Sequence, residues 1–345
     1  MLKIKAILFL AILAMVTGCF PSNGLGKKEI LLQGMTMGTV SYNVKYVVQE
    51  SEQANLITQS KEIHKDIDDI LKKLNQDMSN WISDSELSTF NQSTSLEPME
   101  ISVGLSRVIA ESIRLGNLSQ GKLDVTIGPL INLWGFGPEA RPEKVPSENE
   151  INTTRQRIGL QHLSLEGNLL TKAIPNLYVD LSTIAKGYAV DLVAEYFERI
   201  GIHDFLVEIG GELRVKGFKH TGELWHVAIE KPVANERSVH QIIIPKDNAV
   251  ATSGDYRKYF ESDGQRFSHI IDPDTGKPIN HKLVSVTVIH PSSMTADGLS
   301  TAMMLMGEEK AYAFAEEQDL AAYMIIKTDH GFVEQSTVKF MQYLK

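Results

Sequence analysis

The sequence predicts an α+β fold with a largely antiparallel sheet at its core and helices inserted between groups of strands. Apolar runs bounded by turn residues occur in clusters, and amphipathic helical patterns separate the clusters without regular β–α–β alternation. No G-x-G-x-x-G or P-loop sequence follows any of these runs. The parallel nucleotide-binding folds therefore lack their fingerprint in this chain.

Composition and charge limit the classes of function. The 345 residues, 43% of them hydrophobic, are enough for one large domain or two of average size. Lys and Arg number 34 against 43 Asp and Glu, a formal net charge of −9. A binder of duplex DNA needs a basic face, so nucleic acid is not an expected partner. An anionic small-molecule substrate would need a metal ion or a local group of donors.

The first 18 residues are predicted to be a lipoprotein signal peptide. Lys3 and Lys5 precede an apolar stretch, Ala6 to Val16, which is shorter than the ~20 residues that span a bilayer as a helix. The stretch ends in small residues directly before Cys19, an order that resembles the bacterial lipobox.

Cys19 is the only cysteine of the chain, so it has no partner for an internal disulfide. We expect it to carry acyl chains, palmitate among them, that hold the mature protein at the periplasmic side of the inner membrane. The outer membrane is the alternative, because Phe20 and not Asp follows the cysteine. Residues 19–29 are predicted to form a polar, Gly-containing tether, and residues 30–345 to form the folded domain.

Apolar spacing of three and four residues predicts the helices. They are expected at Ser60–Leu74, Ser102–Leu115, Ile184–Ile200, Ala296–Met306 and Glu308–Gln318, with a further helix starting near Ser147 after a charged, Pro-containing surface loop. Ser102 is expected to cap its helix and Gly116 to close it.

Short β-branched and aromatic runs predict the strands. They are expected at Phe205–Ile209, Trp225–Glu230, Gln241–Ile244, Ser268–Ile271, Val284–Ile289 and Ala322–Lys327. The run Ser268–Ile271 places His269 within a strand, where a lone histidine is usually structural.

The segment Thr295–Ala302 offers a candidate metal site. Asp297 and Thr301 are four residues apart at the start of a helix, so their oxygens point to one side. A carboxylate with a hydroxyl suits Mg²⁺. The alternative is structural: Thr295 or Asp297 could cap the helix by accepting its free N–H groups.

The segment Asp180–Tyr188 leads from an apolar run into a helix. Lys186 would add positive charge where the helix dipole already favours an anion. The alternative is a plain capped helix with a surface lysine. His64 and Asp68, also four apart, lie among charged neighbours, and a solvated helix face is the better interpretation for them than a metal pair.

Ten segments, taken together and in this order, resemble the ApbE family of FAD:protein FMN transferases. They are Met35–Thr39, Met78–Trp81, Asp84–Leu87, Leu123–Thr126, Gly128–Gly137, Asp180–Asp191, Gly210–Glu212, Ala251–Tyr256, Ser268–Gly276 and Ala296–Ala302. The resemblance covers the whole mature chain and implies an ApbE/T-fold-like architecture. Two positions depart from the usual pattern: Ser182-Thr183 replaces a smaller pair, and Gly298 replaces a common alanine.

The resemblance implies an activity and a set of site residues. Members bind FAD and Mg²⁺ and transfer FMN to a Ser or Thr of an acceptor, typically a membrane-bound respiratory flavoprotein subunit, with release of AMP. By motif, Asp297, Thr301 and the Thr183 carbonyl match Mg²⁺ ligands; Met37, Asn80, Trp81, Asp124, Lys186 and Ile271 match positions that line the FAD site; His269 matches a histidine of the transfer step. We expect His269 to act as the base and Lys186 to stabilise phosphate charge.

Two other functions would use the same motifs. An FAD pyrophosphatase would cleave FAD to FMN and AMP with water as acceptor. A periplasmic lipoprotein that stores or delivers FAD would bind it without turnover. Detection of free FMN and AMP in the absence of an acceptor protein would indicate the pyrophosphatase, whereas tight FAD binding without turnover in Mg²⁺ would indicate the carrier.

Overall fold

The structure is a computed structural model that describes residues 26–49, 53–138, 145–232, 239–255, 259–262 and 265–345. The predicted signal peptide, Cys19 and most of the tether lie outside these residues. Strand β1 begins at Lys27, so the last residues of the tether predicted over 19–29 belong to the fold. Within the described ranges, no helix is long and apolar enough to cross a membrane.

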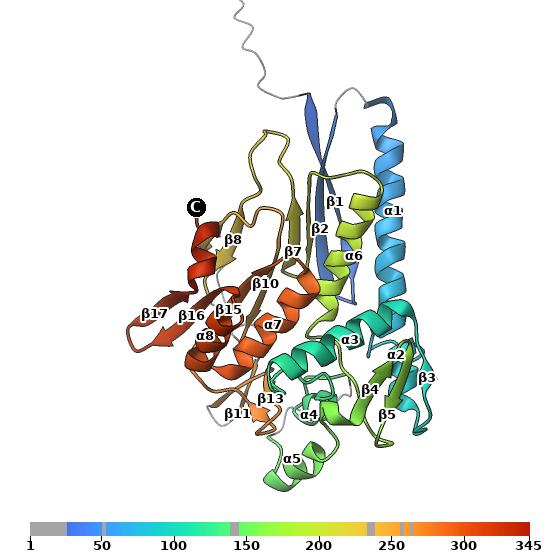
Figure 1. The fold of residues 1–345 in the computed structure, drawn as a ribbon, viewed down its shortest axis with the longest axis vertical. Helices are drawn as coiled ribbons and strands as arrows, with labels where there is room; N and C mark the ends of the chain where they lie inside the picture. The colour runs from blue at the N-terminus through green and yellow to red at the C-terminus, as the bar shows by residue number, and fades with distance from the viewer. Residues whose placement is uncertain (1–25, 50–52, 139–144, 233–238, 256–258, 263–264) are drawn as a thin grey trace, which may run out of the picture.

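An eight-stranded sheet forms the centre of the molecule (Figure 1). Its order is β1-β2-β6-β7-β10-β15-β16-β17, and every pairing is antiparallel. The strands are β1 (Lys27–Thr36), β2 (Val40–Gln49), β6 (Phe205–Ile209), β7 (Glu212–Lys216), β10 (Ala249–Gly254), β15 (Leu283–His290), β16 (Ala321–Thr328) and β17 (Gly331–Ser336). This confirms the predicted fold class.

The hairpin β1–β2 was not predicted from the sequence. Strand β1 lies at the edge of the sheet and is largely exposed, so its residues do not alternate cleanly between apolar and polar. The central strands β6, β15 and β16 were predicted to within one residue at each end. Their clear patterns are the reason: β16 begins as an apolar run, and β6 and β15 place apolar residues at every second position.

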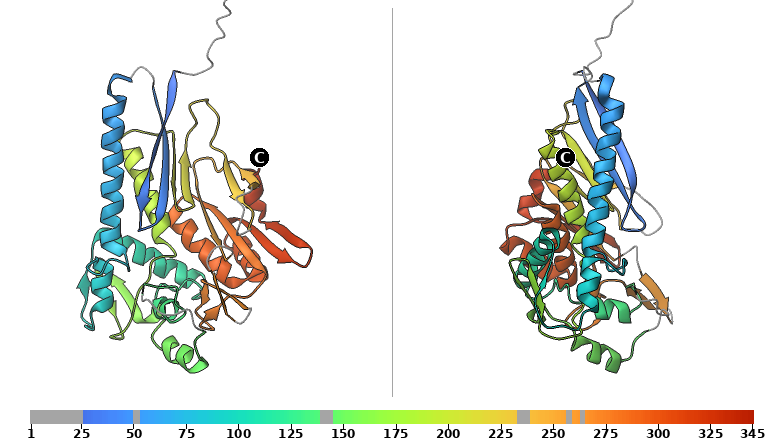
Figure 2. Two further views of the ribbon diagram at one scale, coloured as in Figure 1. Left: turned by 180° about the vertical axis from the view of Figure 1, so that it is seen from behind. Right: turned by 90° about the vertical axis from the view of Figure 1, so that its right-hand side faces the viewer.

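Helices cover one face of the sheet. They are α1 (Gln53–Met78), α6 (Ala185–Arg199), α7 (Ser293–Met306) and α8 (Glu308–Glu317). Ile67 of α1, Val193 of α6 and Met303 of α7 are buried in one core with Val207 and Val286 of the sheet. Helix α1 runs alongside the β1–β2 hairpin, as Figure 2 shows from two further sides. All four were predicted, although α1 extends beyond the expected Ser60–Leu74 at both ends.

A second core lies on the opposite face of the sheet. It is covered by the hairpin β8 (Val227–Glu230) and β9 (Val239–Ile243) and by the 3₁₀ helix η3 (Val338–Tyr343). The rings of Tyr323 and Phe340 stack there with centroids 5.2 Å apart. Trp225 precedes β8 instead of belonging to it, contrary to the predicted strand, and donates its indole N–H to the backbone of Lys216.

The remaining elements lie below the sheet in the view of Figure 1. They are α2 (Glu86–Gln92), β3 (Met99–Glu100), α3 (Val103–Leu118), α4 (Gly128–Leu133), α5 (Glu148–Arg155), η2 (Leu160–His162), β4 (Leu163–Glu166), β5 (Leu169–Lys172), and the hairpins β11 (Tyr259–Ser262) with β12 (Gln265–Ser268) and β13 (Ile271–Asp272) with β14 (Lys277–Pro278). The predicted cap of α3 by Ser102 and the helix start at Ser147 are confirmed.

Helix α3 continues to Leu118 and does not close at Gly116 as predicted. A Cβ on Gly116 would lie 2.1 Å from Cδ1 of Leu160 and 2.7 Å from the carbonyl oxygen of Leu123. Gly116 therefore lies within the helix, where its lack of a side chain allows Leu160 and Leu123 to pack closely against it. The chain turns later, at Gly121, whose φ is +86°.

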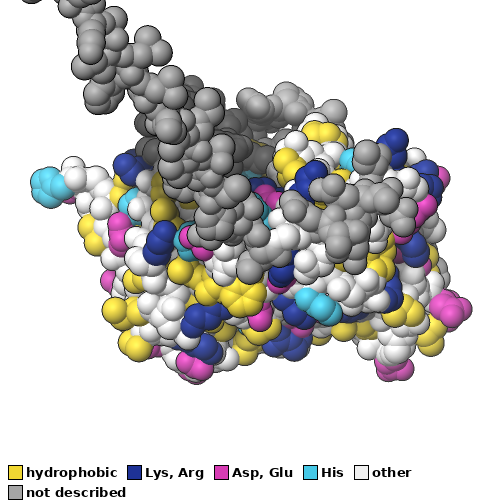
Figure 3. Space-filling model, turned by 90° about the horizontal axis from the view of Figure 1, so that it is seen from above, with side chains coloured by type: hydrophobic (Ala, Val, Ile, Leu, Met, Phe, Trp, Pro, Cys, Tyr) yellow, Lys and Arg dark blue, Asp and Glu magenta, His cyan; other side chains and the backbone are white. Residues whose placement is uncertain are grey.

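The end of the molecule at which β1 begins has a mixed surface. Seen from above, basic, acidic and apolar side chains are interspersed on it (Figure 3). Lys27 pairs with Asp204 at 2.8 Å and Lys45 with Glu29 at 3.1 Å. Two of the basic side chains at this end are thus paired with carboxylates.

Candidate functional site

The candidate site is centred where helices α6 and α7 cross. Gly187, in the first turn of α6, donates its backbone N–H to the Asp297 carboxylate over 2.9 Å. A Cβ on Gly187 would lie 2.3 Å from the carbonyl oxygen of Ser293, so only glycine lets the helices approach this closely. The Asp297 side chain is consequently interior, with 3% of it exposed.

A second carboxylate, Asp191 on α6, holds the start of α7. Asp191 accepts hydrogen bonds from the backbone N–H groups of Ser293 and Met294, both at 3.0 Å, and from the Ser292 hydroxyl at 2.7 Å. Arg214 supplies the compensating charge, 3.2 Å from the same carboxylate. The free N–H groups at a helix start favour a negative charge, so Asp191 stabilises the position of α7.

Asp297 does not cap its own helix. The side chain that caps α7 is Ser292, whose hydroxyl accepts the backbone N–H of Thr295. Thr295 donates its own hydroxyl to Glu111 of α3 at 2.6 Å. Neither Thr295 nor Asp297, the two side chains considered as caps, has that role. Helix α7 also starts at Ser293, three residues before the predicted Ala296.

Lys186 lies between two buried carboxylates. Its Nζ is 3.4 Å from Oδ1 of Asp297 and 3.4 Å from Oε1 of Glu212. Burial lowers the pKa of the ammonium, but the charges of the two carboxylates outweigh this effect and raise the pKa. Burial also raises the pKa of Asp297, and that of Glu212 to about 8. The alternative of a solvated surface lysine is therefore wrong.

Oxygen atoms gather around this cluster. Thr301 is one turn after Asp297 on α7, and its hydroxyl is 3.0 Å from that of Ser253 on β10. Thr183 lies just before α6, and its hydroxyl oxygen is buried with no hydrogen-bond partner among the described residues. In the same ranges no group of three His, Cys, Asp or Glu side chains could hold a metal ion.

This donor set fits Mg²⁺. The ion is commonly held by one or two carboxylates, with further oxygens from water and substrate phosphate. Asp297 offers the carboxylate, Thr301 a hydroxyl, and Thr183 a backbone carbonyl beside its unpaired hydroxyl. Sites for zinc, by contrast, are usually built from several Cys or His side chains.

The β1–β2 turn reaches the same cluster. Met37 is in this turn with a left-handed φ of +47°, and its side chain packs on the main core. A Cβ on Gly210 would lie 2.7 Å from Cγ1 of Val40 and 3.5 Å from Cδ of Lys186. The turn that carries Met37 therefore lies next to Lys186.

Asn80 and Trp81 lie in the turn that follows α1. Trp81 is 74% exposed. Asn80 accepts a hydrogen bond of 3.3 Å from Asn91, which also bonds both backbone groups of Val179. Because Val179 leads into the segment before α6, Asn80 is joined to the approach to Lys186.

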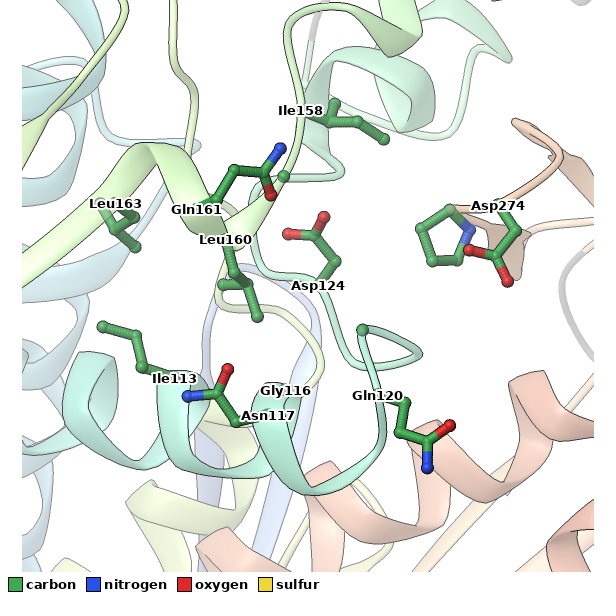
Figure 4. Close-up of a pocket in the computed structure, with 13 residues that line it drawn as sticks. Ile113, Gly116, Asn117, Gln120, Asp124, Ile158, Leu160, Gln161, Leu163 and Asp274 are labelled. Atoms are coloured by element: carbon green, nitrogen blue, oxygen red, sulfur yellow. The ribbon is translucent and has the colours of Figure 1, made fainter.

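Asp124 lines a cavity of about 570 Å³ between the end of α3, the segment around η2 and the β13–β14 turn (Figure 4). Its carboxylate points into the opening between Gln161 and Asp274. Burial raises the pKa of Asp124, although Thr126 donates two hydrogen bonds to it. The next residue, Val125, accepts the N–H of Asp180 at 2.7 Å, which ties this wall to the segment before α6.

His269 lies at a bend and not in the predicted strand over 268–271. Strand β12 ends at Ser268 and β13 begins at Ile271, because the two segments pair in different hairpins. The His269 ring lies edge-on to Phe136, with centroids 6.3 Å apart. Ile271 is buried in a third core with Trp134.

The predicted residues thus form two groups. Lys186, Asp297 and Thr301 lie around the α6–α7 crossing, with Thr183 and the Met37 turn beside them. Asn80 and Asp124 are joined to this group through the backbone of residues 179–180. His269 and Ile271 lie toward the β13–β14 hairpin, which Lys122 ties to the Asp124 loop through Asp272 and Asp274.

His64 and Asp68 have a structural role that the sequence did not show. The hydroxyl of Tyr42 lies 2.7 Å from Nε2 of His64 and donates to Asp68 at 2.6 Å. The pair links α1 to β2 through Tyr42, while Asp68 remains exposed on the helix face, as the sequence predicts.

Comparison with known proteins identifies the family. The profile of the ApbE family matches residues 37–324. The chain belongs to the ApbE family. This confirms the resemblance carried by the ten motifs, and the matched range contains both groups of site residues.

Relatives in the ApbE family agree along nearly the whole chain. The FAD:protein FMN transferase of Vibrio cholerae is 52% identical over 97% of this chain and 97% of its own. That of Haemophilus influenzae is 49% identical over 91% of each chain. The solved structure of the flavin transferase ApbE from Vibrio cholerae covers 92% of this chain and 100% of its own, with a TM-score of 0.84. The predicted class, a transferase, is the class of these relatives.

Two buried carboxylates beside the site were given no role in the ApbE-family motifs. Glu212 was quoted within the Gly210–Glu212 motif but given no role, and Asp191 ended the Asp180–Asp191 motif. The structure places one beside Lys186 and the other at the start of α7. A carboxylate among apolar residues and glycines, as in Ile209-Gly210-Gly211-Glu212-Leu213, was the available signal, because such a residue is rarely buried without a partner.

Proposed function

We propose that this ApbE-family chain is a Mg²⁺-dependent FAD:protein FMN transferase that attaches FMN to a Ser or Thr of an acceptor protein and releases AMP. The observation that carries the proposal is the buried Lys186–Asp297–Glu212 cluster at the α6–α7 crossing. A cation site beside an ammonium group is suited to a pyrophosphate. The Vibrio cholerae relative with this name supports the choice of substrate.

In this proposal each predicted residue has a place in the reaction. Asp297, Thr301 and the Thr183 carbonyl would hold Mg²⁺, which when bound offsets the charge of the pyrophosphate. Lys186 lies beside them to neutralise phosphate oxygens. The remaining contacts to FAD are assigned to Met37, Asn80, Trp81, Asp124 and Ile271.

The transfer step is a displacement at phosphorus. The acceptor hydroxyl oxygen forms a bond to the phosphorus of the FMN half, and the bond from that phosphorus to the bridging oxygen breaks. AMP leaves with the bonding electrons, and the hydroxyl proton passes to His269. His269 is half-buried at a bend outside any strand, and in this proposal the acceptor protein approaches at that bend.

The cellular setting is part of the proposal. We propose acylation of Cys19 and attachment to the inner membrane on its periplasmic side, which would bring the domain close to flavoprotein subunits of membrane electron-transport complexes. The lipobox-like sequence before Cys19 supports the anchor.

The test uses the full-length protein in detergent with FAD, Mg²⁺ and an apo flavoprotein domain of a respiratory complex. After denaturing electrophoresis, a fluorescent acceptor band that EDTA abolishes is the expected result. Free FMN and AMP without a labelled acceptor would contradict the transferase and support a pyrophosphatase. FAD that stays bound without turnover on two acceptors would support a carrier.

A further inference from the structure

Glu212 is a buried carboxylate to which neither the predicted ligands nor the proposed transfer step assigns a role. It is the first residue of β7, directly after Gly210 and Gly211, which both have positive φ. Its side chain is 5% exposed. Burial of a carboxylate is unfavourable unless its oxygens are paired, so the position calls for partners on both oxygens.

The fold supplies a partner for only one of these oxygens. Oε1 faces Nζ of Lys186 at 3.4 Å, whereas Oε2 is buried and has no hydrogen-bond partner within the part of the chain that the structure describes. Glu208, on the neighbouring strand β6, differs. Its two oxygens accept hydrogen bonds from Gly211 at 2.7 Å and from Asn43 at 2.6 Å.

The unpaired oxygen lies on the same side as Lys186. A Cβ built on Gly210 would be 3.5 Å from Cδ of Lys186 and 3.8 Å from Oε2 of Glu212. The missing side chain of Gly210 therefore leaves space that both groups border. The buried hydroxyl of Thr183, also unpaired within the described residues, is at the start of the helix that carries Lys186.

We propose that Glu212 is a ligand-binding residue of this site: Oε1 positions the Lys186 ammonium, and Oε2 accepts a hydrogen bond from an O–H donor. The donor is a hydroxyl of the bound dinucleotide or a water carried by the cation. The inference rests on the proposed function, which brings both to the site. Glu212 would also remain as a negative partner of Lys186 when Asp297 binds the cation.

The test measures FAD binding by flavin fluorescence on the full-length protein, in EDTA and in Mg²⁺. Glu212→Met keeps the side-chain length and removes both acceptor oxygens, and we expect it to raise Kd about tenfold or more. Glu212→Gln keeps one acceptor oxygen, and about threefold is expected. Glu195→Met on α6 removes an exposed carboxylate paired with Arg107 at 2.7 Å, and Kd should not change.

The two conditions identify the donor. A Glu212→Met defect of equal size in EDTA and Mg²⁺ assigns the donor to the dinucleotide, whereas a defect confined to Mg²⁺ assigns it to a cation-bound water. In a Lys186→Met background, Glu212→Met should weaken binding less than in the wild type, because one of its two contacts is already gone.

Unchanged Kd for Glu212→Met in both conditions, even with a lowered melting temperature, would overturn the inference and leave a structural role. Equal effects of Glu212→Met with and without Lys186 would overturn the positioning of Lys186. The wild-type arm reports separately on the proposed function: tight FAD binding without transfer to an acceptor contradicts the transferase but not the role of Glu212.

Discussion

Two parts of the site are built in opposite ways: the α6–α7 crossing, and the two aromatic turns that carry Trp81 and His269. At the crossing, Asp191 is 1% exposed and the Asp297 side chain 3%, and both accept hydrogen bonds from the facing helix. Trp81 is 74% exposed in its turn, and His269 lies at a bend between two short strands. The crossing, to which the proposed function assigns the cation and the phosphates, is therefore preorganised by the core, whereas the Trp81 turn is exposed and His269 is half-buried outside any strand.

This difference separates two kinds of variant. Changes at the crossing should act on stability and on binding together, because the same contacts hold the helices and the carboxylates. Changes at the aromatic turns should act on catalysis or binding alone.

The largest effect is expected at the aromatic turn that carries His269. His269→Ala should slow FMN transfer by about 10² to 10⁴-fold because the acceptor hydroxyl loses its base. The Kd for FAD and the melting temperature should stay as in the wild type. Rates of acceptor labelling and fluorescence titration measure the two quantities, with His330→Ala in the exposed β16–β17 turn as control. A matching loss of FAD affinity would make His269 a binding residue.

Asp191→Ala tests the interior of the crossing. Removing this carboxylate takes away one of the two carboxylates that pair with Arg214, since Glu198 is the other. It also leaves the N–H groups of Ser293 and Met294 unsatisfied. We expect the free energy of unfolding to fall by about 3–5 kcal/mol, measured by denaturant titration.

The control for this variant is Glu195→Ala on the same helix, which breaks an exposed ion pair with Arg107. It should change stability by about 1 kcal/mol or less. Equal losses for the two variants would mean that the Asp191 network does not hold α7.

Gly187→Ala tests the close approach of the helices. The added Cβ would overlap the Ser293 carbonyl, so α6 and α7 must separate at the point where Gly187 bonds Asp297. The expected loss is about 1–3 kcal/mol of stability, with weaker Mg²⁺-dependent FAD binding.

Gly104→Ala is the matched control, since a Cβ there meets only ordinary contacts at 3.5 Å and beyond in the first turn of α3. It should be neutral or stabilising by up to about 1 kcal/mol. A Gly187→Ala protein as stable as this control would show that the crossing is not tightly packed.

Trp81→Ala should have the smallest effect. The side chain is exposed, so stability should change by about 0.5 kcal/mol or less. Loss of aromatic contact with the flavin should weaken FAD binding by about 0.5–1.5 kcal/mol, or about two- to tenfold in Kd. Trp225→Phe, in the core on the other face of the sheet, should show the reverse pattern of lower stability and unchanged Kd. An unchanged Kd for Trp81→Ala would remove Trp81 from the flavin site.

Elements whose pattern depends on near neighbours were predicted well. The helix periodicities, the caps at Ser102 and Ser147, and the buried strand Phe205–Ile209 were all found. The edge strand β1 was missed, and the strand over 268–271 proved to be two. Both errors concern hairpins between neighbouring segments: β1 is an edge strand, and residues 268–271 lie where two short hairpins meet, so neither run alternates cleanly between apolar and polar residues.

The sequence by itself determined the local chemistry: the Asp297–Thr301 pair one helical turn apart, the lysine at the start of α6, and the ordered motifs that identify the family. Only the tertiary structure decided that Glu212 faces Lys186, that Asp191 holds α7, and that Gly187 and Gly116 are packing positions. The physical reason is distance along the chain. A helix or cap forms between residues a few positions apart, whereas a buried charge finds its partner only after strands and helices far apart in sequence have packed.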